Sequence, residues 1–170
     1  MMRSSAKRAA YGGLFAAAAL LFSYVESLLP LQLFIPIPGF KLGLANVCVM
    51  LAFYYLGAID GLLITLAKCG LTALLFGTPV SFWFSLGGGL LSYCFLLVAK
   101  FVIKENISFI GVSVACAALH NVGQVLVFSI IFKDIAVFWY LEWLLPISLI
   151  TGILTGLLAF SFKKIAEKKL

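Results

Sequence analysis

Apolar residues fill long runs along the whole chain, separated by short polar or proline-rich breaks. Six runs come close to the ~20 residues that a helix needs to cross a bilayer. They cover residues 9–29, 41–57, 60–77, 81–103, 107–132 and 135–162. The pattern predicts an all-α integral membrane protein, with residues 1–170 forming a single transmembrane domain built as a six-helix bundle. The boundary between the second and third runs is the least distinct, because only a short turn at residues 57–61 separates them.

Positive charges gather at one set of the expected helix ends. If the N-terminus is cytoplasmic, the inner ends hold Arg3, Lys7, Arg8, Lys100, Lys104, Lys163, Lys164, Lys168 and Lys169, whereas the outer ends hold Lys41 and Lys133. Cytoplasmic loops of membrane proteins carry an excess of lysine and arginine. The distribution therefore predicts that both termini are cytoplasmic and that the protein is a multi-pass protein of the cell membrane. The net charge of +6 reflects this topology, and we expect no nucleic-acid partner.

The composition excludes a soluble domain. Hydrophobic residues make up 64% of the chain and charged residues 11%, and the mean hydropathy is +1.19. Soluble globular domains carry roughly 45–50% apolar and ~25% charged residues. The four cysteines lie singly within apolar runs, so we expect them to act as small packing residues.

Three polar residues lie close together in the fifth run. His120, which is the only histidine, is followed by Asn121 and then by Gln124. At 100° per residue these side chains fall within one 100° arc of a helix. Polar groups are costly in hydrocarbon and usually mark a bundle interior, a pathway or a ligand pocket. The pattern therefore predicts one hydrogen-bonding face on an otherwise apolar helix.

Lys68 lies near the middle of the third run. A lysine at this depth costs roughly 2.5–3.5 kcal/mol on insertion scales, so it should be paired or in contact with water. Pairing with Glu26 or Glu142 would make it structural. Binding of an anionic ligand group would make it functional, and extension of the side chain to the interface is a third possibility.

The polar residues within the runs lie at mid-depth or in the outer half of the bilayer in this topology. This asymmetry predicts a pocket that opens to the outside and is closed by apolar packing below. The expected ligand-binding residues are Asn46, Lys68, His120, Asn121, Gln124 and Glu142. In this interpretation Lys68 anchors a charge and Glu142 supplies the counter-charge.

The connection after the first run contains Pro30, Pro36 and Pro38, which prevent a regular helix. An apolar segment without helical hydrogen bonds must shelter its backbone against protein or water. The segment is either an interfacial loop resting on the bundle or an outer lid over the pocket. The residues expected to gate such a pocket are Phe34, Pro36, Pro38 and Phe40.

Small residues recur at four-residue spacing in the first run, among them Ala6, Ala10, Gly13 and Ala17. This spacing lets helix backbones approach closely and favours association in bilayers. The surface could pack inside this protein or dock a partner subunit. The Gly87–Gly89 triplet in the fourth run indicates close packing or a local break, because the lysine and hydroxyl residue of a phosphate-binding loop do not follow it.

Groups of residues suited to catalysis are missing from the sequence. Asp60 and Asp134 are isolated in opposite loops, and no two carboxylates share a helical face. His120 has no serine or cysteine nucleophile in a recognisable arrangement. The chain also lacks a set of metal ligands and a nucleotide-binding motif. We therefore predict a binding protein or conduit that is not an enzyme, has no metal site and carries no cofactor of its own.

Several segments together carry a family resemblance: Lys41-Leu-Gly-Leu-Ala-Asn46, Leu74-Leu-Phe-Gly-Thr78, Ser85-Leu-Gly-Gly-Gly-Leu-Leu-Ser92, and Ile110-Gly-Val-Ser113 leading to His120-Asn-Val-Gly-Gln124. Over residues 10–160 the chain resembles the Gx transporter family, also catalogued as heptaprenyl diphosphate synthase component I. The resemblance implies a substrate-binding S component of an energy-coupling factor transporter. Such a protein has six helices, a first helix that docks on a transmembrane coupling subunit with its ATPases, a gating loop after that helix, and an outward-facing pocket.

The second family name implies an alternative. Prenyl diphosphate synthases hold magnesium and diphosphate on two aspartate-rich motifs, and this chain supplies neither, so it would be a non-catalytic membrane partner in prenyl diphosphate or quinone metabolism. Relatives lie beside flavin and quinone genes, including loci for extracellular electron transfer in Gram-positive bacteria. That association implies a Gram-positive source and a link to flavin or quinone handling. It does not identify the ligand, for which a flavin, a quinone and an isoprenoid-like molecule are the candidates.

Overall fold

The computed structural model describes residues 5–29, 41, 43–103 and 108–169, and within these ranges the regular structure is entirely helical. The elements are α1 (Ser5–Leu28), α2 (Asn46–Tyr55), α3 (Ala58–Phe76), α4 (Pro79–Val98), the π-helical turn η2 (Ala99–Ile103), α5 (Phe109–Phe132), the 3-10 turn η4 (Ala136–Tyr140) and α6 (Leu141–Lys169). The expected gating residues Phe34, Pro36, Pro38 and Phe40 lie outside the described residues.

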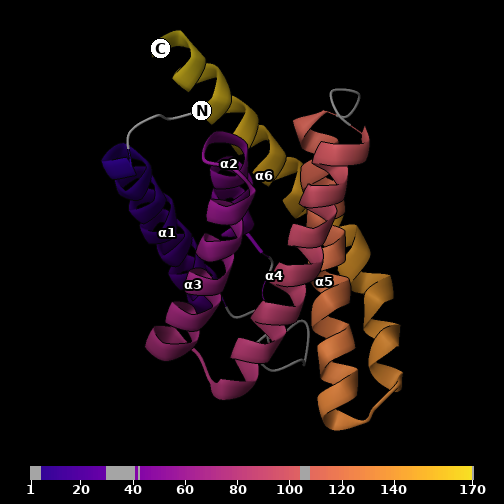
Figure 1. Cartoon of the computed structure of the whole chain (residues 1–170). Coiled ribbons are helices and arrows are strands. Elements are labelled where there is room, and N and C mark those ends of the chain that lie inside the picture. Colours follow the sequence, from indigo (N-terminus) through magenta and orange to yellow (C-terminus); the bar gives the residue numbers. More distant parts are fainter. Residues whose placement is uncertain (1–4, 30–40, 42, 104–107, 170) are drawn as a thin grey trace.

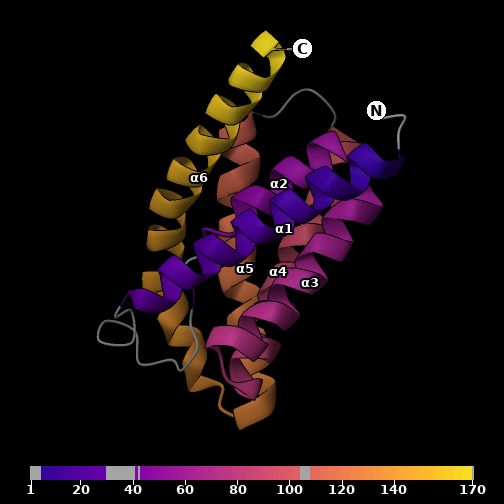
Figure 2. The ribbon, with the colours of Figure 1, turned by 90° about the vertical axis from the view of Figure 1, so that its left-hand side faces the viewer.

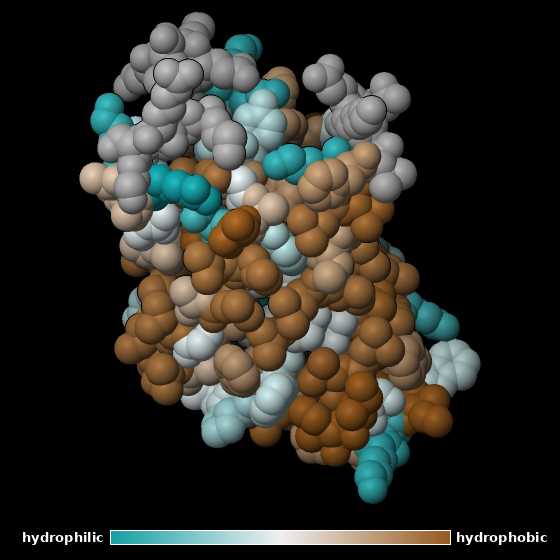
Figure 3. Space-filling model, in the orientation of Figure 1, coloured by the Kyte–Doolittle hydropathy of each residue, from teal (hydrophilic) through white to brown (hydrophobic). Residues whose placement is uncertain are grey.

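Five of the helices, α1, α3, α4, α5 and α6, are long and apolar enough to cross a membrane. Together with the absence of strands from the described part of the chain, they confirm an all-α membrane bundle. Most of their large apolar side chains point outward, as lipid contact requires. Leu74, Ile130 and Trp143 are 83%, 75% and 73% exposed. Figure 3 shows this apolar surface as a broad brown band, with hydrophilic side chains gathered towards its two ends.

The second helix is shorter than its apolar run. The run covers residues 41–57, but α2 begins only at Asn46. Gly43 has a φ of +83°, which is incompatible with a right-handed helix, and the following turns are closed by three-residue hydrogen bonds such as Asn46 N to Gly43 O. At 1.5 Å per residue, ten residues extend about 15 Å, half of a bilayer core. The expected second full span is therefore a half-length helix preceded by a non-helical segment.

The long helices α3, α4, α5 and α6 run alternately up and down and pack side by side, and α1 crosses obliquely over α2 and α3 (Figures 1 and 2). Both described ends of the chain lie at the same end of the bundle (Figure 1). An ion pair between Arg8 Nε and Asp60 Oδ2 at 2.6 Å joins α1 to α3 near this end. The shared position of the ends fits the predicted topology, and the cytoplasmic assignment stays a prediction.

Glycines allow α4, α5 and α6 to approach one another closely. A Cβ added to Gly88 would lie 2.6 Å from the backbone oxygen of His120, and one added to Gly123 would lie 2.6 Å from that of Gly87. A Cβ at Gly152 would lie 2.5 Å from Val114 Cα. Because α4 continues as a helix through the triplet, Gly87–Gly89 serves close packing and is not a local break.

Candidate ligand-binding site

A buried lysine and the first residue of α2 form the centre of the candidate site. Lys68 is only 4% exposed, and its Nζ donates a hydrogen bond to Asn46 Oδ1 at 2.7 Å. Because of the break, α2 begins at Asn46, and the amide of this residue reaches Lys68 of α3. Asn46 Nδ2 is buried and has no hydrogen-bond partner among the described residues. The pair thus leaves an unused donor in the interior of the bundle.

The polar face of α5 approaches the same break. His120 is 1% exposed, and its Nε2 lies 2.9 Å from Gln124 Nε2. Gln124 reaches the backbone of Lys41, where its Oε1 lies 3.5 Å from the N–H and its Nε2 lies 3.4 Å from the carbonyl oxygen. A Cβ at Gly43 would lie 3.2 Å from the His120 ring, so the non-helical segment passes directly over the histidine. Gln124 therefore supplies hydrogen-bond partners that a helix would otherwise provide.

Glu26 of α1 holds the next part of this segment. Its Oε1 accepts a hydrogen bond from the Leu44 N–H at 3.0 Å, and the Gly43 N–H also contributes to holding the carboxylate. The side chain is 3% exposed and interacts electrostatically with Lys68 and Lys41. Glu26 is therefore the acid that the fold brings towards the buried lysine.

The structure corrects the role expected for Glu142. That side chain is exposed in the first turn of α6, where a carboxylate is favoured by the helix dipole. It cannot serve as the buried counter-charge, and Glu26 occupies that position. Neither Glu26 nor Glu142 places a carboxylate oxygen within 4 Å of Lys68 Nζ.

Asn121 serves a different contact from its neighbours on α5. Its Nδ2 donates to the carbonyl oxygen of Leu144 at 3.2 Å, which ties α5 to α6. Its Oδ1 is buried without a partner in the described part of the chain. Of the six residues expected to bind a ligand, Asn46 and Lys68 are joined directly and His120 and Gln124 border the same segment. Asn121 binds α6 instead, and Glu142 lies outside.

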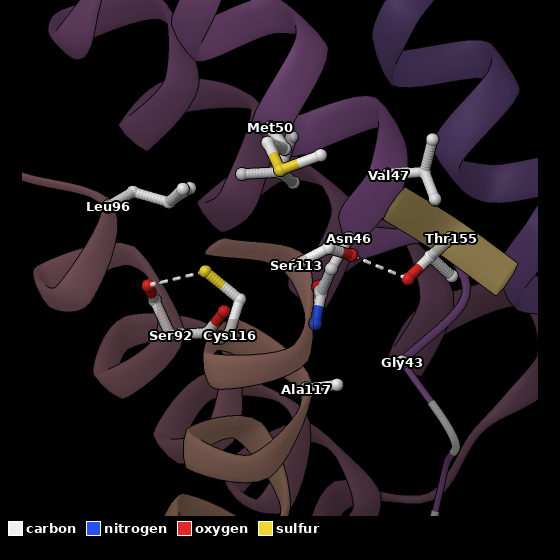
Figure 4. Close-up of a pocket in the computed structure, with 12 residues that line it drawn as sticks. Gly43, Asn46, Val47, Met50, Ser92, Leu96, Ser113, Cys116, Ala117 and Thr155 are labelled. Atoms are coloured by element: carbon white, nitrogen blue, oxygen red, sulfur yellow. Dashed lines mark hydrogen bonds between the residues drawn. The ribbon is translucent and has the colours of Figure 1, made fainter. Parts of the chain in front are cut away.

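A small cavity lies next to Asn46, between α2, α4, α5 and α6 (Figure 4). Its volume is about 20 Å³, and its polar lining residues are Asn46, Ser92, Ser113, Cys116 and Thr155. Ser113 and Thr155 hydroxyls lie 2.7 Å apart, and Cys116 Sγ lies 3.7 Å from the carbonyl oxygen of Ser92. A water molecule needs about 10–15 Å³ of such space. The cavity therefore has room for a water molecule but not for a larger ligand in this conformation, and the outward-opening pocket stays a prediction.

The charges of the cluster are not balanced. Lys41 is half-buried and interacts electrostatically with both Lys68 and Glu26. Two lysines thus surround one carboxylate. The donors that remain unused suit a ligand with hydrogen-bond acceptors. In the described part of the chain no three His, Cys, Asp or Glu side chains come together to hold a metal ion.

Glu26 and Lys41 were not among the residues expected to bind a ligand, because the sequence suggested Glu26 only as a structural partner of Lys68 and Lys41 only as a charge at an outer helix end. A signal for Glu26 was present, because Ala19, Ser23 and Glu26 follow one another at four- and three-residue spacing and all are buried. This spacing defines one face of α1. The many alanines and glycines on the other faces of α1 obscured it.

The small residues expected to dock a partner lie on the exposed side of α1. Ala6, Ala10, Gly13 and Ala17 are all exposed, and a Cβ added to Gly13 would meet no atom within 4 Å. These positions are therefore free of helix packing within the described part of the chain. Docking of a partner on this face stays a prediction.

Comparison with known proteins identifies the family. The family model for heptaprenyl diphosphate synthase component I matches residues 15–162. Since this match covers most of the chain, the protein belongs to that family. No curated protein and no solved structure matches the chain.

Proposed function

We propose that this member of the heptaprenyl diphosphate synthase component I family is a membrane-embedded binding subunit. It captures a small molecule inside the bundle from the outer side and works with a partner docked on α1. The observation that carries the proposal is the buried Lys68–Asn46 pair at the break before α2. A charge of this kind at mid-membrane is costly, and in membrane proteins it is typical of substrate or ion sites.

The broken second helix supports the same conclusion. Non-helical backbone at membrane depth is tolerated where protein buries it or where it lines a cavity. Transporters commonly place their binding sites at such interrupted helices. Here Gly43 and Asn46 belong both to the break and to the cavity wall. A ligand larger than water enters when Lys41 and Leu44 move away from Gln124 and Glu26, which hold them in this conformation.

A second candidate function rests on the family name. In that case the protein is a non-catalytic membrane partner of a prenyl diphosphate synthase, and the exposed face of α1 docks the catalytic component. A flavin, a quinone or an isoprenoid-like molecule is then a suitable occupant of the interior. The buried polar cluster favours ligand capture over this alternative, because a purely structural anchor has no need of a buried lysine.

Purification from native membranes in a mild detergent, with cross-linking beforehand, separates the two candidates. Recovery of a transmembrane coupling subunit with two ATPases supports uptake by an energised transporter. Recovery of a soluble prenyltransferase alone would overturn transport in favour of the second candidate. Mass spectrometry of the same sample identifies a bound flavin or quinone, and finding neither counts against a role in electron transfer.

A further inference from the structure

The buried carboxylate of Glu26 occupies a place that is suited to an anion. Its carboxylate accepts the Leu44 N–H at 3.0 Å, beside the Gly43 N–H, just before the N-terminal end of α2. Backbone N–H groups without a helical hydrogen-bond partner at such a position attract an anion, and the helix dipole adds to the attraction. Lys41 and Lys68 contribute two positive charges to the same place. These groups together form a site for an anion, and the chain's own glutamate fills it.

One positive charge remains after Glu26 is counted. Lys68 is 4% exposed and its hydrogen-bond partner is the neutral amide of Asn46, not a carboxylate. The other end of that amide, Asn46 Nδ2, is a buried donor without a described partner and belongs to the cavity wall. The buried ammonium of Lys68 and the unused N–H of Asn46 therefore lie close together. A ligand group that is negatively charged and accepts hydrogen bonds would satisfy both.

We propose that the ligand carries a carboxylate or a similar anionic group, and that Glu26 is a placeholder that this group displaces. The inference rests on the proposed function and specifies the class of molecule captured. On binding, the anionic group accepts hydrogen bonds from the N–H groups of residues 43 and 44 and pairs with Lys68. The Glu26 carboxylate then gives up its own hydrogen bonds to these N–H groups. The same exchange releases the segment before α2, which the Glu26 carboxylate holds closed.

Acetate tests the site without knowledge of the natural ligand, because it reproduces the end of a glutamate side chain. Thermal unfolding of the detergent-purified full chain is followed in sodium acetate and in acetamide at equal ionic strength, so that only the charge of the probe differs. We expect acetate to raise the Tm of Glu26→Ala above its value in acetamide. In the wild-type protein Glu26 competes with acetate as a group tethered to the same chain. Its removal should therefore lower the acetate concentration that gives half of the maximal Tm increase by about tenfold relative to wild type.

Two further variants complete the test. The double variant E26A/K68M should lose the acetate-specific stabilisation, whereas Glu142→Ala and Lys133→Met, which change exposed charges, should behave as wild type. An E26A protein that responds equally to acetate and acetamide would overturn the anion site. A wild-type protein that never responds, beside an E26A protein that does, would overturn displacement of Glu26. Either failure leaves capture of an uncharged molecule intact, so the proposed function is judged separately by what co-purifies with the protein.

Discussion

Single glycines decide how closely α4, α5 and α6 pack. Gly152 of α6 lies against the backbone of Val114 in α5, where an added Cβ would meet Cα at 2.5 Å and the backbone nitrogen at 3.1 Å. Backbone atoms cannot move aside as a flexible side chain can. Gly70 of α3, in contrast, has no atom within 4 Å of an added Cβ. The two positions therefore differ in packing although both are helical glycines.

Substitution at these positions should have opposite effects on stability. Gly152→Ala forces α5 and α6 apart, and overpacking of this kind costs about 1–3 kcal/mol of the free energy of unfolding. Gly70→Ala should leave stability unchanged or raise it by up to about 1 kcal/mol, because alanine favours the helix. Unfolding in detergent, followed by circular dichroism, measures both. Equal stability of the two variants would contradict the packing described for α5 and α6.

Among the elements, α1 is the least buried of the long helices. It contacts α2 and α3 through a face that includes Ala19 and Glu26, and the small residues of its opposite side remain exposed. In a bilayer, small residues at four-residue spacing allow another helix to approach closely. The surface thus suits a helical partner better than lipid alone.

Enlarging this surface should block the partner and spare the fold. Replacement of Gly13 and Ala17 by leucine places bulky side chains where a second helix would pack, and we expect at least a several-fold loss of the protein that co-purifies. Ala67→Leu is the matched control, because Ala67 is an exposed alanine of α3 outside the docking surface. If the control loses the partner equally, or if the α1 variant keeps it, docking on α1 is wrong.

The helices were predictable from the sequence because apolar length alone determines whether a segment can cross a bilayer. The long helices α1, α3, α4, α5 and α6 begin and end within seven residues of the predicted runs. The break before α2 was not predictable, since residues 42–45 are apolar and Gly43 alone does not exclude a helix. For the same reason the sequence predicted only part of the candidate site. Lys68 and Asn46 stood out as polar residues in apolar runs, but their contact depends on where α2 begins.

The choice between Glu26 and Glu142 could not be made from sequence. Both acids lie near the ends of apolar runs, and only the oblique crossing of α1 over α2 and α3 buries one of them (Figure 2). The position of Glu142 in the first turn of α6 explains its presence without a ligand. Which of the two acids is buried therefore depends on how the helices pack, and hydrophobic periodicity carries no information about that packing.

The whole molecule has a distinct sidedness. The start of α1, the turn η2 and the end of α6 lie at the end where both termini are found, and they carry Lys7, Lys100 and Lys164; the end of α5, which Lys133 follows, lies at the opposite end (Figure 1). The positive-inside rule then predicts that the end with the termini faces the cytoplasm.

Cysteine labelling tests this orientation. In intact cells, a membrane-impermeant maleimide should label Lys133→Cys at several times the background of the wild-type protein, whose own four cysteines set the baseline. Lys164→Cys should become labelled only after the membrane is permeabilised, because its side chain lies on the cytoplasmic side. The reverse pattern would place the termini outside, and the proposed capture from the outer side would be wrong.

Capture of a small molecule by the buried Lys68 is the central claim, and native mass spectrometry of the protein purified from its own membranes tests it most directly. We expect a small-molecule adduct on the wild-type protein and on Lys133→Met, and its loss from Lys68→Met, with folding of each variant verified by circular dichroism. A wild-type protein without an adduct, or a Lys68→Met protein that retains it in full, would contradict a ligand site at Lys68.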